Sequence, residues 1–112
     1  MAGIPTHHTV LVTLRRGELT LNKTVVTIEP GAQDDITWIK GEGSEPFTFC
    51  TLEFIDTVHP FINLSVQPTK ITVDDDNQKT WDYGYLIWVH DAHNKRHRTK
   101  TLIQTGPTIK NK

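Results

Sequence analysis

The sequence predicts an all-β fold, arranged as an antiparallel β-sandwich of about eight strands. Short runs of β-branched and aromatic residues alternate with turns made of Gly, Pro and Asp, which is the usual pattern of sandwich strands. No long segment repeats apolar residues at the i, i+3, i+4 and i+7 positions of an amphipathic helix. The C-terminal third has the pattern of a β-hairpin. Without helices to cover a sheet, two sheets must cover each other.

The first strand is expected over residues 9–14, where Val10, Val12 and Leu14 alternate with less apolar neighbours before a turn at 15–18. Within 47–55, strict alternation would place Phe47, Phe49 and Thr51 on one face, and Cys50, Leu52 and Phe54 on the other. The remaining strands before the hairpin are expected at 19–21, 24–28, 36–39, 62–66 and 71–73.

The closing hairpin is expected to run from an apolar strand at 83–90, through a polar turn at 91–95, into an alternating return strand at 96–104. Residues 83–89 are apolar on both alternating faces, which indicates either a central strand covered on both sides or an interface strand. About eight strands in one sandwich favour an immunoglobulin-like shape, although the Cys…Trp…Cys spacing of true immunoglobulin domains is absent.

Composition indicates one domain over residues 1–112 and excludes several classes of protein. Twelve basic and thirteen acidic residues give a net charge of −1, whereas a general nucleic-acid binder has a basic excess. No apolar run approaches the roughly 18 residues of a membrane-spanning helix, and the N-terminus lacks a signal-peptide pattern. The lone Cys50 excludes an internal disulfide and is expected to be a buried structural thiol. It favours a reducing compartment, so we expect a cytoplasmic protein.

Three histidines in the hairpin form a candidate metal site, at His90, His93 and His97. If His90 and His97 flank the turn as cross-strand neighbours, their Cβ atoms would lie within about 5.5 Å. Asp91 or His93 would then supply a third ligand. The alternative is an ordinary polar turn, beside which Arg96 and Arg98 would repel a cation. No other cofactor is expected.

The carboxylates suggest two further hypotheses, a calcium site and a pair of carboxylates that share a proton. Residues 74–77 carry three Asp and an Asn that could ligate calcium, but they lack the Gly and distal Glu of an EF-hand loop, so a solvated turn is favoured. Paired carboxylates can also share a proton and activate water if the fold brings them together. The candidates for such pairing are Asp34, Asp35, Asp56, Asp82 and Asp91.

Aromatic residues at 81, 83, 85 and 88, interleaved with Arg96, Arg98 and Lys100, could stack on a polyanion or a sugar, or could form core. Residues 26–31 and 36–38 resemble the early strands of cupredoxins. A blue-copper site also needs two His near a Cys, and no His closely follows Cys50. This resemblance therefore concerns sandwich architecture alone.

The early Ile28-Glu29-Pro30-Gly31, together with the ending Thr105-Gly106-Pro107-Thr108-Ile109-Lys110-Asn111, resembles the bacterial DP-EP family. The resemblance implies a single-domain β-sandwich that cleaves itself at an Asp-Pro bond by an aspartic-peptidase-like mechanism and forms a covalent Lys–Asp link. It would place the processing site at Gly106 and Pro107, with Asp82 and Asp91 as candidate acids.

The chain departs from that family pattern because it contains no Asp-Pro, and Gly106 stands where the cleaved Asp is expected. Glycine has no carboxyl group, so it can neither attack its own carbonyl nor form a bond to Lys95 or Lys100. A relative with this sequence would either not cleave or would use an external carboxylate.

Three functions are therefore open. The first is a non-enzymatic interaction or structural domain, which binds an unknown protein partner or associates with itself through an exposed strand. The second is the self-processing peptidase-like protein, and the third is a metal binder that uses the histidine turn. If His90 and His97 are neighbours, their repulsion when protonated also predicts a less stable hairpin below about pH 6.

Overall fold

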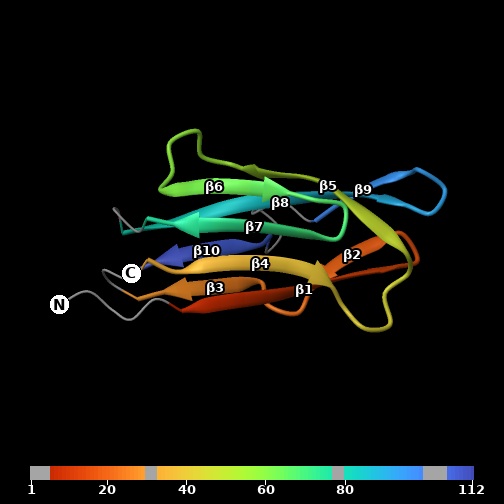
Figure 1. Ribbon diagram of the computed structural model, residues 1–112, viewed down its shortest axis with the longest axis horizontal. Coiled ribbons are helices and arrows are strands. Elements are labelled where there is room, and N and C mark those ends of the chain that lie inside the picture. Colours follow the sequence, from red (N-terminus) through yellow and green to blue (C-terminus); the bar gives the residue numbers. More distant parts are fainter. Residues whose placement is uncertain (1–5, 30–32, 77–79, 100–105) are drawn as a thin grey trace.

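The computed structural model describes residues 6–29, 33–76, 80–99 and 106–112. These residues form ten strands and no helix (Figure 1). The all-β prediction is confirmed, with more strands than the eight expected. The strands are β1 (His7–Arg15), β2 (Glu18–Leu21), β3 (Val25–Ile28), β4 (Asp35–Lys40), β5 (Phe47–Phe54), β6 (Phe61–Val66), β7 (Lys70–Asp75), β8 (Trp81–Asp91), β9 (Arg96–Arg98) and β10 (Thr108–Asn111).

The strands form two sheets that pack into a β-sandwich. One sheet has the order β2-β1-β4-β7-β6, and the other has the order β3-β10-β8-β5, with β9 also paired to β8. The predicted antiparallel sandwich contains two parallel pairings, so both sheets are mixed: β1 runs parallel to β4, and β3 runs parallel to β10. Both parallel pairs join strands from distant parts of the sequence, so no local turn pattern announces them.

The core lies between the two sheets and takes alternate residues from each strand. In β1, Val10, Val12 and Leu14 are buried while their neighbours are more exposed, as the alternation predicted. Trp38 of β4 and Tyr85 of β8 lie in the core and contact each other from the two opposite sheets. The indole Nε1 of Trp38 donates a 3.1 Å hydrogen bond to the Tyr85 hydroxyl, and the two rings meet edge to face at 5.3 Å. Both polar tips are thereby satisfied inside the core.

A β-bulge in β5 changes the faces expected for that strand. Phe49 pairs with Val89 and Thr51 pairs with Trp88, so the extra residue is Cys50. Phe49 and Leu52 are therefore both buried, although simple alternation placed them on opposite faces. Cys50 is a free thiol that is half-buried, so the expectation of a buried residue holds only in part.

The long strand β8 is central, as one of the two interpretations of its apolar run proposed. On one edge it pairs with β5, and on the other it pairs first with β10 and then with β9. The expected return strand at 96–104 is described only as far as Thr99, because residues 100–105 lie outside the described residues. The edge of β8 from Trp81 to Gly84 pairs with β10.

The molecule is elongated, with a longest dimension of 48 Å, and β1 begins near the same end at which β10 ends (Figure 1). Within the part of the chain that the structure describes, no helix is long and apolar enough to cross a membrane.

Candidate functional site

The hairpin does not bring His90 and His97 together. The register pairs His97 with Val89 and His90 with Arg96. Because paired residues share a face and successive residues alternate, His90 and His97 point to opposite faces of the hairpin. The expected cross-strand pair of imidazoles is therefore wrong, and His93 lies in the exposed turn between them. Among the described residues, no group of three or more His, Cys, Asp or Glu is placed to hold a metal ion.

Asp91 is committed to holding the hairpin turn. Its Oδ1 accepts hydrogen bonds from the backbone N–H groups of His93 at 2.8 Å and Lys95 at 2.9 Å. Its Oδ2 lies 2.8 Å from Nε2 of His97. The hydrogen bond from His97, followed by that from the Lys95 backbone, lowers the pKa of Asp91 from 3.8 to about 2. This carboxylate caps an Asx-type turn and has no free oxygen for chemistry at a distant peptide bond.

The candidate processing site, Gly106 and Pro107, is buried at the start of β10. The Pro107 carbonyl accepts a 3.2 Å hydrogen bond from the Tyr85 backbone N–H, and the Gly106 carbonyl accepts one from the Thr108 hydroxyl at 3.3 Å. Neither candidate acid is beside them. Asp91 caps the hairpin turn, and Asp82 pairs with Lys110, which lies three residues beyond Pro107.

The carboxylate that shares a cavity with Pro107 is Glu18 of β2, which the sequence did not single out. This cavity of about 220 Å³ lies where β2, Thr24 and Thr99 approach the start of β10. Strand β2 belongs to the opposite sheet from β10, so the approach of Glu18 to Pro107 depends on how the two sheets stack. A scan for acids near Gly106 in the sequence cannot find it.

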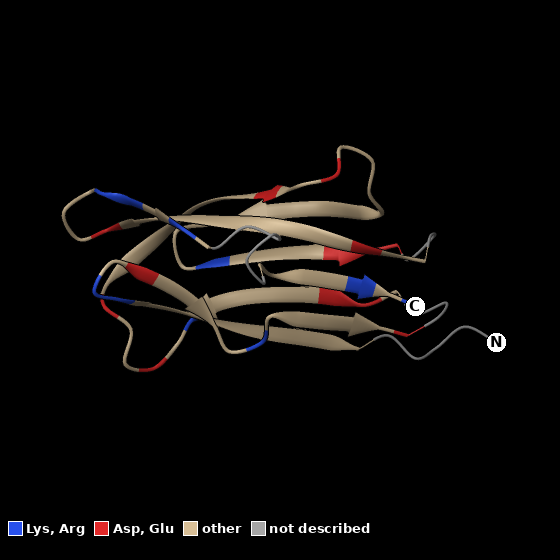
Figure 2. Cartoon of the chain, turned by 180° about the vertical axis from the view of Figure 1, so that it is seen from behind, with Lys and Arg blue, Asp and Glu red and all other residues tan. Residues whose placement is uncertain are grey.

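The aspartates gather instead at the end of the sandwich where β1 begins and β10 ends. This happens because β4 and β8 begin there while β5 and β7 end there. In Figure 2, red acidic segments crowd this end, which also carries the blue segment of β10, whereas the opposite end has both blue and red segments. We call it the acidic end. Its aspartates are Asp34, Asp35, Asp56, Asp74, Asp75, Asp76 and Asp82.

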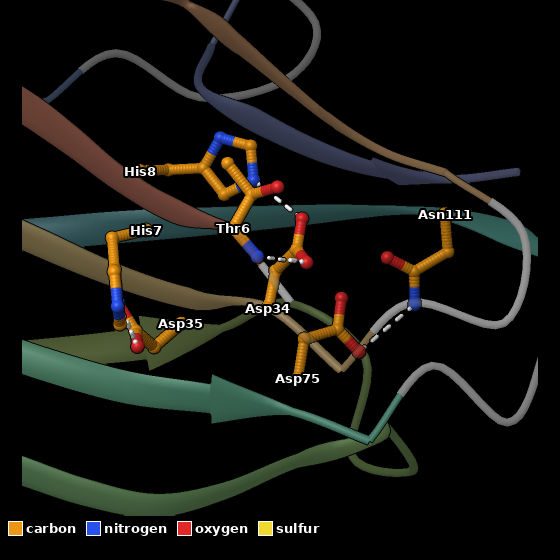
Figure 3. A network of polar contacts seen from close by, with 7 residues as sticks. All are labelled: Thr6, His7, His8, Asp34, Asp35, Asp75 and Asn111. Carbon is orange, nitrogen blue, oxygen red and sulfur yellow. Dashed lines mark hydrogen bonds and ion pairs between the residues drawn. The ribbon is translucent and has the colours of Figure 1, made fainter. Parts of the chain in front are cut away.

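Two of these carboxylates are buried and bonded at the acidic end (Figure 3). Asp34 accepts a 2.8 Å hydrogen bond from the Thr6 backbone N–H and lies 2.6 Å from Nε2 of His8. Asp75 of β7 accepts a 3.2 Å hydrogen bond from the side-chain amide of Asn111 in β10. The backbone N–H of Asp75 in turn donates to the Asp34 carbonyl at 2.9 Å. The network joins the two sheets and stabilises the base of this end.

A pocket of about 280 Å³ opens at the same end, between the loop that follows β5 and the start of β8. The described residues that line it are Asp56, Thr57, Val58, Trp81 and Tyr83. The backbone N–H of Ile55 donates to the Gly84 carbonyl at 2.9 Å, which fixes the start of the loop against β8. Trp81 is 61% exposed, and a second hollow of about 300 Å³ is lined by Trp81 and Asp82. The indole therefore stands between two depressions.

Tyr83 is the buried side chain of this pocket, being only 3% exposed. Its ring meets Phe61 edge to face at 5.2 Å, and Phe61 stacks on Phe54 at 4.4 Å. Burial, followed by the carboxylates of Asp75 and Asp56, raises the pKa of Tyr83, so its hydroxyl stays protonated. That hydroxyl makes no hydrogen bond within the described residues. A hydroxyl that lines a pocket and has no partner can donate to a ligand.

The other half-exposed tryptophan, Trp88, is already occupied by its own neighbours. Its indole N–H donates to Glu53, and the guanidinium groups of Arg96 and Arg98 lie 4.5 and 5.7 Å from its ring centroid. The cross-strand register of β8 and β9 brings these arginines over the ring. Of the aromatic and basic residues expected to clamp a polyanion, Trp88, Arg96 and Arg98 are found together, but they contact one another, and Lys100 lies outside the described residues.

No protein-family model matches the chain, and none of the curated proteins matches it significantly. The resemblance to the DP-EP family therefore stays a prediction. The sequence alone does not single out the pocket at Trp81, because Trp81 belongs to the same aromatic run as Tyr83, Tyr85 and Trp88. Its distinguishing signal is its position ahead of the first buried residue of β8.

Proposed function

We propose that this chain is a non-enzymatic binding domain whose binding site is the pocket at Trp81 in the acidic end. One observation carries the proposal. An exposed indole and the Tyr83 side chain, whose hydroxyl makes no hydrogen bond within the described residues, line the same pocket, which also holds the Asp56 carboxylate. Sites of this kind, concave and aromatic with a few convergent polar groups, are the common form of ligand pockets. The function rests on this site and not on the fold, since sandwiches support unrelated functions.

A two-dimensional ¹H–¹⁵N spectrum tests the proposal, since each of the three tryptophans contributes one indole signal. We expect a panel of small neutral, cationic and anionic compounds to contain members that shift the Trp81 signal in a saturable way. The Trp38 signal serves as an internal control because its indole is buried and bonded to Tyr85. Trp81→Leu should abolish the accompanying shifts of the backbone amide signals of residues 56–58, which line the same pocket, without unfolding the domain. Shifts that never involve Trp81 would overturn the proposal.

Self-processing is the second candidate, supported by the DP-EP resemblance and by the cavity that Glu18 shares with Pro107. Intact-mass spectrometry after long incubation at several pH values separates the two functions. The binding proposal expects one unchanged mass. A fragment that ends at Gly106, and that disappears in Glu18→Gln, would favour the peptidase instead.

Metal binding through His90, His93 and His97 stays an untested prediction, which the register of the hairpin does not favour because His90 and His97 lie on opposite faces. A zinc titration followed by the histidine ring signals tests it, and a joint shift of all three signals at neutral pH would be required. Cytoplasmic location and self-association through an edge strand also stay predictions. The edge strand β6 exposes Ile62 and Leu64, so it is the edge where association would be sought.

A further inference from the structure

The described charged residues that line the two depressions beside Trp81 are carboxylates, and Lys110 lies next to them as the cross-strand partner of Asp82. Asp56 is the charged group that lines the pocket, Asp82 lines the second hollow beside the indole, and Asp75 lies close enough to raise the pKa of Tyr83. No described Lys or Arg lines either depression. The resulting negative potential repels phosphates and carboxylates and attracts cations.

The aromatic group is suited to an organic cation. The face of an indole ring carries negative charge, and Trp is the aromatic side chain that attracts ammonium groups most strongly. Trp81 offers this face at the rim of a pocket whose volume is about 280 Å³, near the lower limit of small-molecule sites. The site is thus sized for one ammonium group with its methyl or methylene substituents.

Bare metal ions and neutral sugars fit this arrangement less well. A metal ion needs several converging ligands, and no group of three His, Cys, Asp or Glu is placed for one among the described residues. A sugar would use the indole and the carboxylate but would gain nothing from the excess negative charge. An ammonium group uses the ring face and the carboxylate together, because both attract positive charge.

We propose that the pocket between Trp81 and Asp56 binds an organic ammonium group, with the indole face on one side and the carboxylate on the other. The inference rests on the proposed binding function and names the chemical class of its ligand. The Tyr83 hydroxyl lies in the same pocket and provides a polar contact for a substituent of the ligand. The ammonium group belongs either to a small free amine or to a lysine side chain of a partner protein.

Choline and its neutral carbon isostere, 3,3-dimethylbutan-1-ol, provide the decisive comparison because they share a shape and differ by one charge. Binding is followed by the Trp81 indole signal and by quenching of tryptophan fluorescence. We expect choline to bind saturably and the isostere to bind at least about fivefold more weakly, as removal of roughly 1 kcal/mol of attraction requires. Added salt should weaken choline binding. Equal binding of the two compounds would overturn the inference.

Three variants locate the site. Asp56→Asn should weaken choline binding by about fivefold while leaving the isostere unaffected. Trp81→Leu should abolish the binding of both, as followed by the backbone amide signals of residues 56–58. Trp88→Leu is the matched control, since it removes the other half-exposed indole at the opposite part of β8 and should leave choline binding unchanged. Choline binding that survives Trp81→Leu but is lost in Trp88→Leu would contradict the assignment.

Two further probes distinguish the source of the ammonium group and separate this inference from the proposed function. Nα-acetyl-lysine amide, and its ε-trimethylated form, represent a partner's side chain. Tighter binding of either than of choline indicates a protein ligand, and the reverse indicates a free amine. Methyl β-glucoside tests the sugar alternative. If the glucoside binds at Trp81 and choline does not, the ammonium inference fails while the binding function stands. If no probe shifts Trp81, both fail.

Discussion

Asp91 fits the sequence pattern of a metal ligand and that of an acid, but its role in the structure is to cap the hairpin turn. It stands among three histidines, so it was a candidate metal ligand and a candidate acid. Its two oxygens are used by the turn and by His97, with three hydrogen bonds in all. The sequence Asp-Ala-His-Asn-Lys predicted a turn correctly, and that ordinary reading explains the residue.

The pH dependence of the hairpin follows from this role of Asp91. The register removes the expected repulsion between His90 and His97, so we expect no loss of hairpin stability near pH 6. Because the folded state lowers the pKa of Asp91 from 3.8 to about 2, the ionised carboxylate stabilises the fold fully above about pH 4. That contribution is lost as the pH falls from about 4 to 2.

Amide hydrogen exchange at His93 and Lys95 measures this directly, since their N–H groups bond to Asp91. Protection corrected for intrinsic exchange should be constant from pH 7 to 4.5 and should fall below that. Asp91→Asn should remove the pH dependence, whereas Asp82→Asn, an exposed Asp on the same strand, should preserve it. A fall in protection between pH 7 and 5 would contradict the assignment.

At the scale of elements, β10 closes the sheet although it has only four residues. It lies between β3, to which it is parallel, and β8, to which it is antiparallel. Both its edges are therefore paired, and its inward residue Ile109 is fully buried in the core. The neighbouring β3 places Val26 and Ile28 in the core and leaves Val25 about half exposed.

Ile109→Ala should therefore destabilise the domain by about 2–4 kcal/mol, because it removes buried methyl groups and leaves a cavity between two sheets. Val25→Ala is the matched control in the adjacent strand, paired next to Thr108, and should cost about 0.5 kcal/mol or less. Urea denaturation of both variants measures the difference. Equal small losses would mean that β10 is not packed as a core strand.

The elements also show which parts of the fold a sequence can predict. Alternation in β1 and the two-sided apolar run in β8 predicted a buried first strand and a central closing strand, because these are local patterns that burial imposes. The parallel pairs, the bulge at Cys50 and the pairing of β10 depend on contacts between distant segments. The same applies to the site, since the Trp81 pocket joins residues 56–58 to residues 81–83.

At the scale of the whole molecule, strand direction separates the charges. The net charge is only −1, yet every Asp except Asp91 lies at the acidic end, while Arg15, Arg16, Lys95 and Arg96 lie at or beside turns of the opposite end, together with Glu18, Glu42 and Glu45. Composition therefore hides a charge asymmetry along the 48 Å axis. Such an asymmetry orients an approaching cation toward the acidic end and supports the placement of the binding site there.

The buried pair of Asp75 and Asn111 ties the two sheets together at the acidic end, and a double-mutant cycle measures how strongly. Each residue is 1% exposed, and their 3.2 Å hydrogen bond crosses from β7 to β10. Asp75→Ala, Asn111→Ala and the double variant should give a coupling free energy of about 1–3 kcal/mol, as expected for a buried hydrogen bond to a carboxylate.

Asn63 and Asp74 provide the comparison, since they form the same type of bond at 2.9 Å between β6 and β7 of one sheet, but in an exposed position. Water competes for that bond, so its cycle should give a coupling below about 0.5 kcal/mol. Similar values for the two pairs would show that burial adds nothing to the strength of this hydrogen bond. Two small values would show that the bond from Asn111 does not hold the sheets together. A larger value for the buried pair alone would show that this hydrogen bond holds the sheets together at the base of the Trp81 pocket, because Asn111 pairs with Trp81 through the backbone.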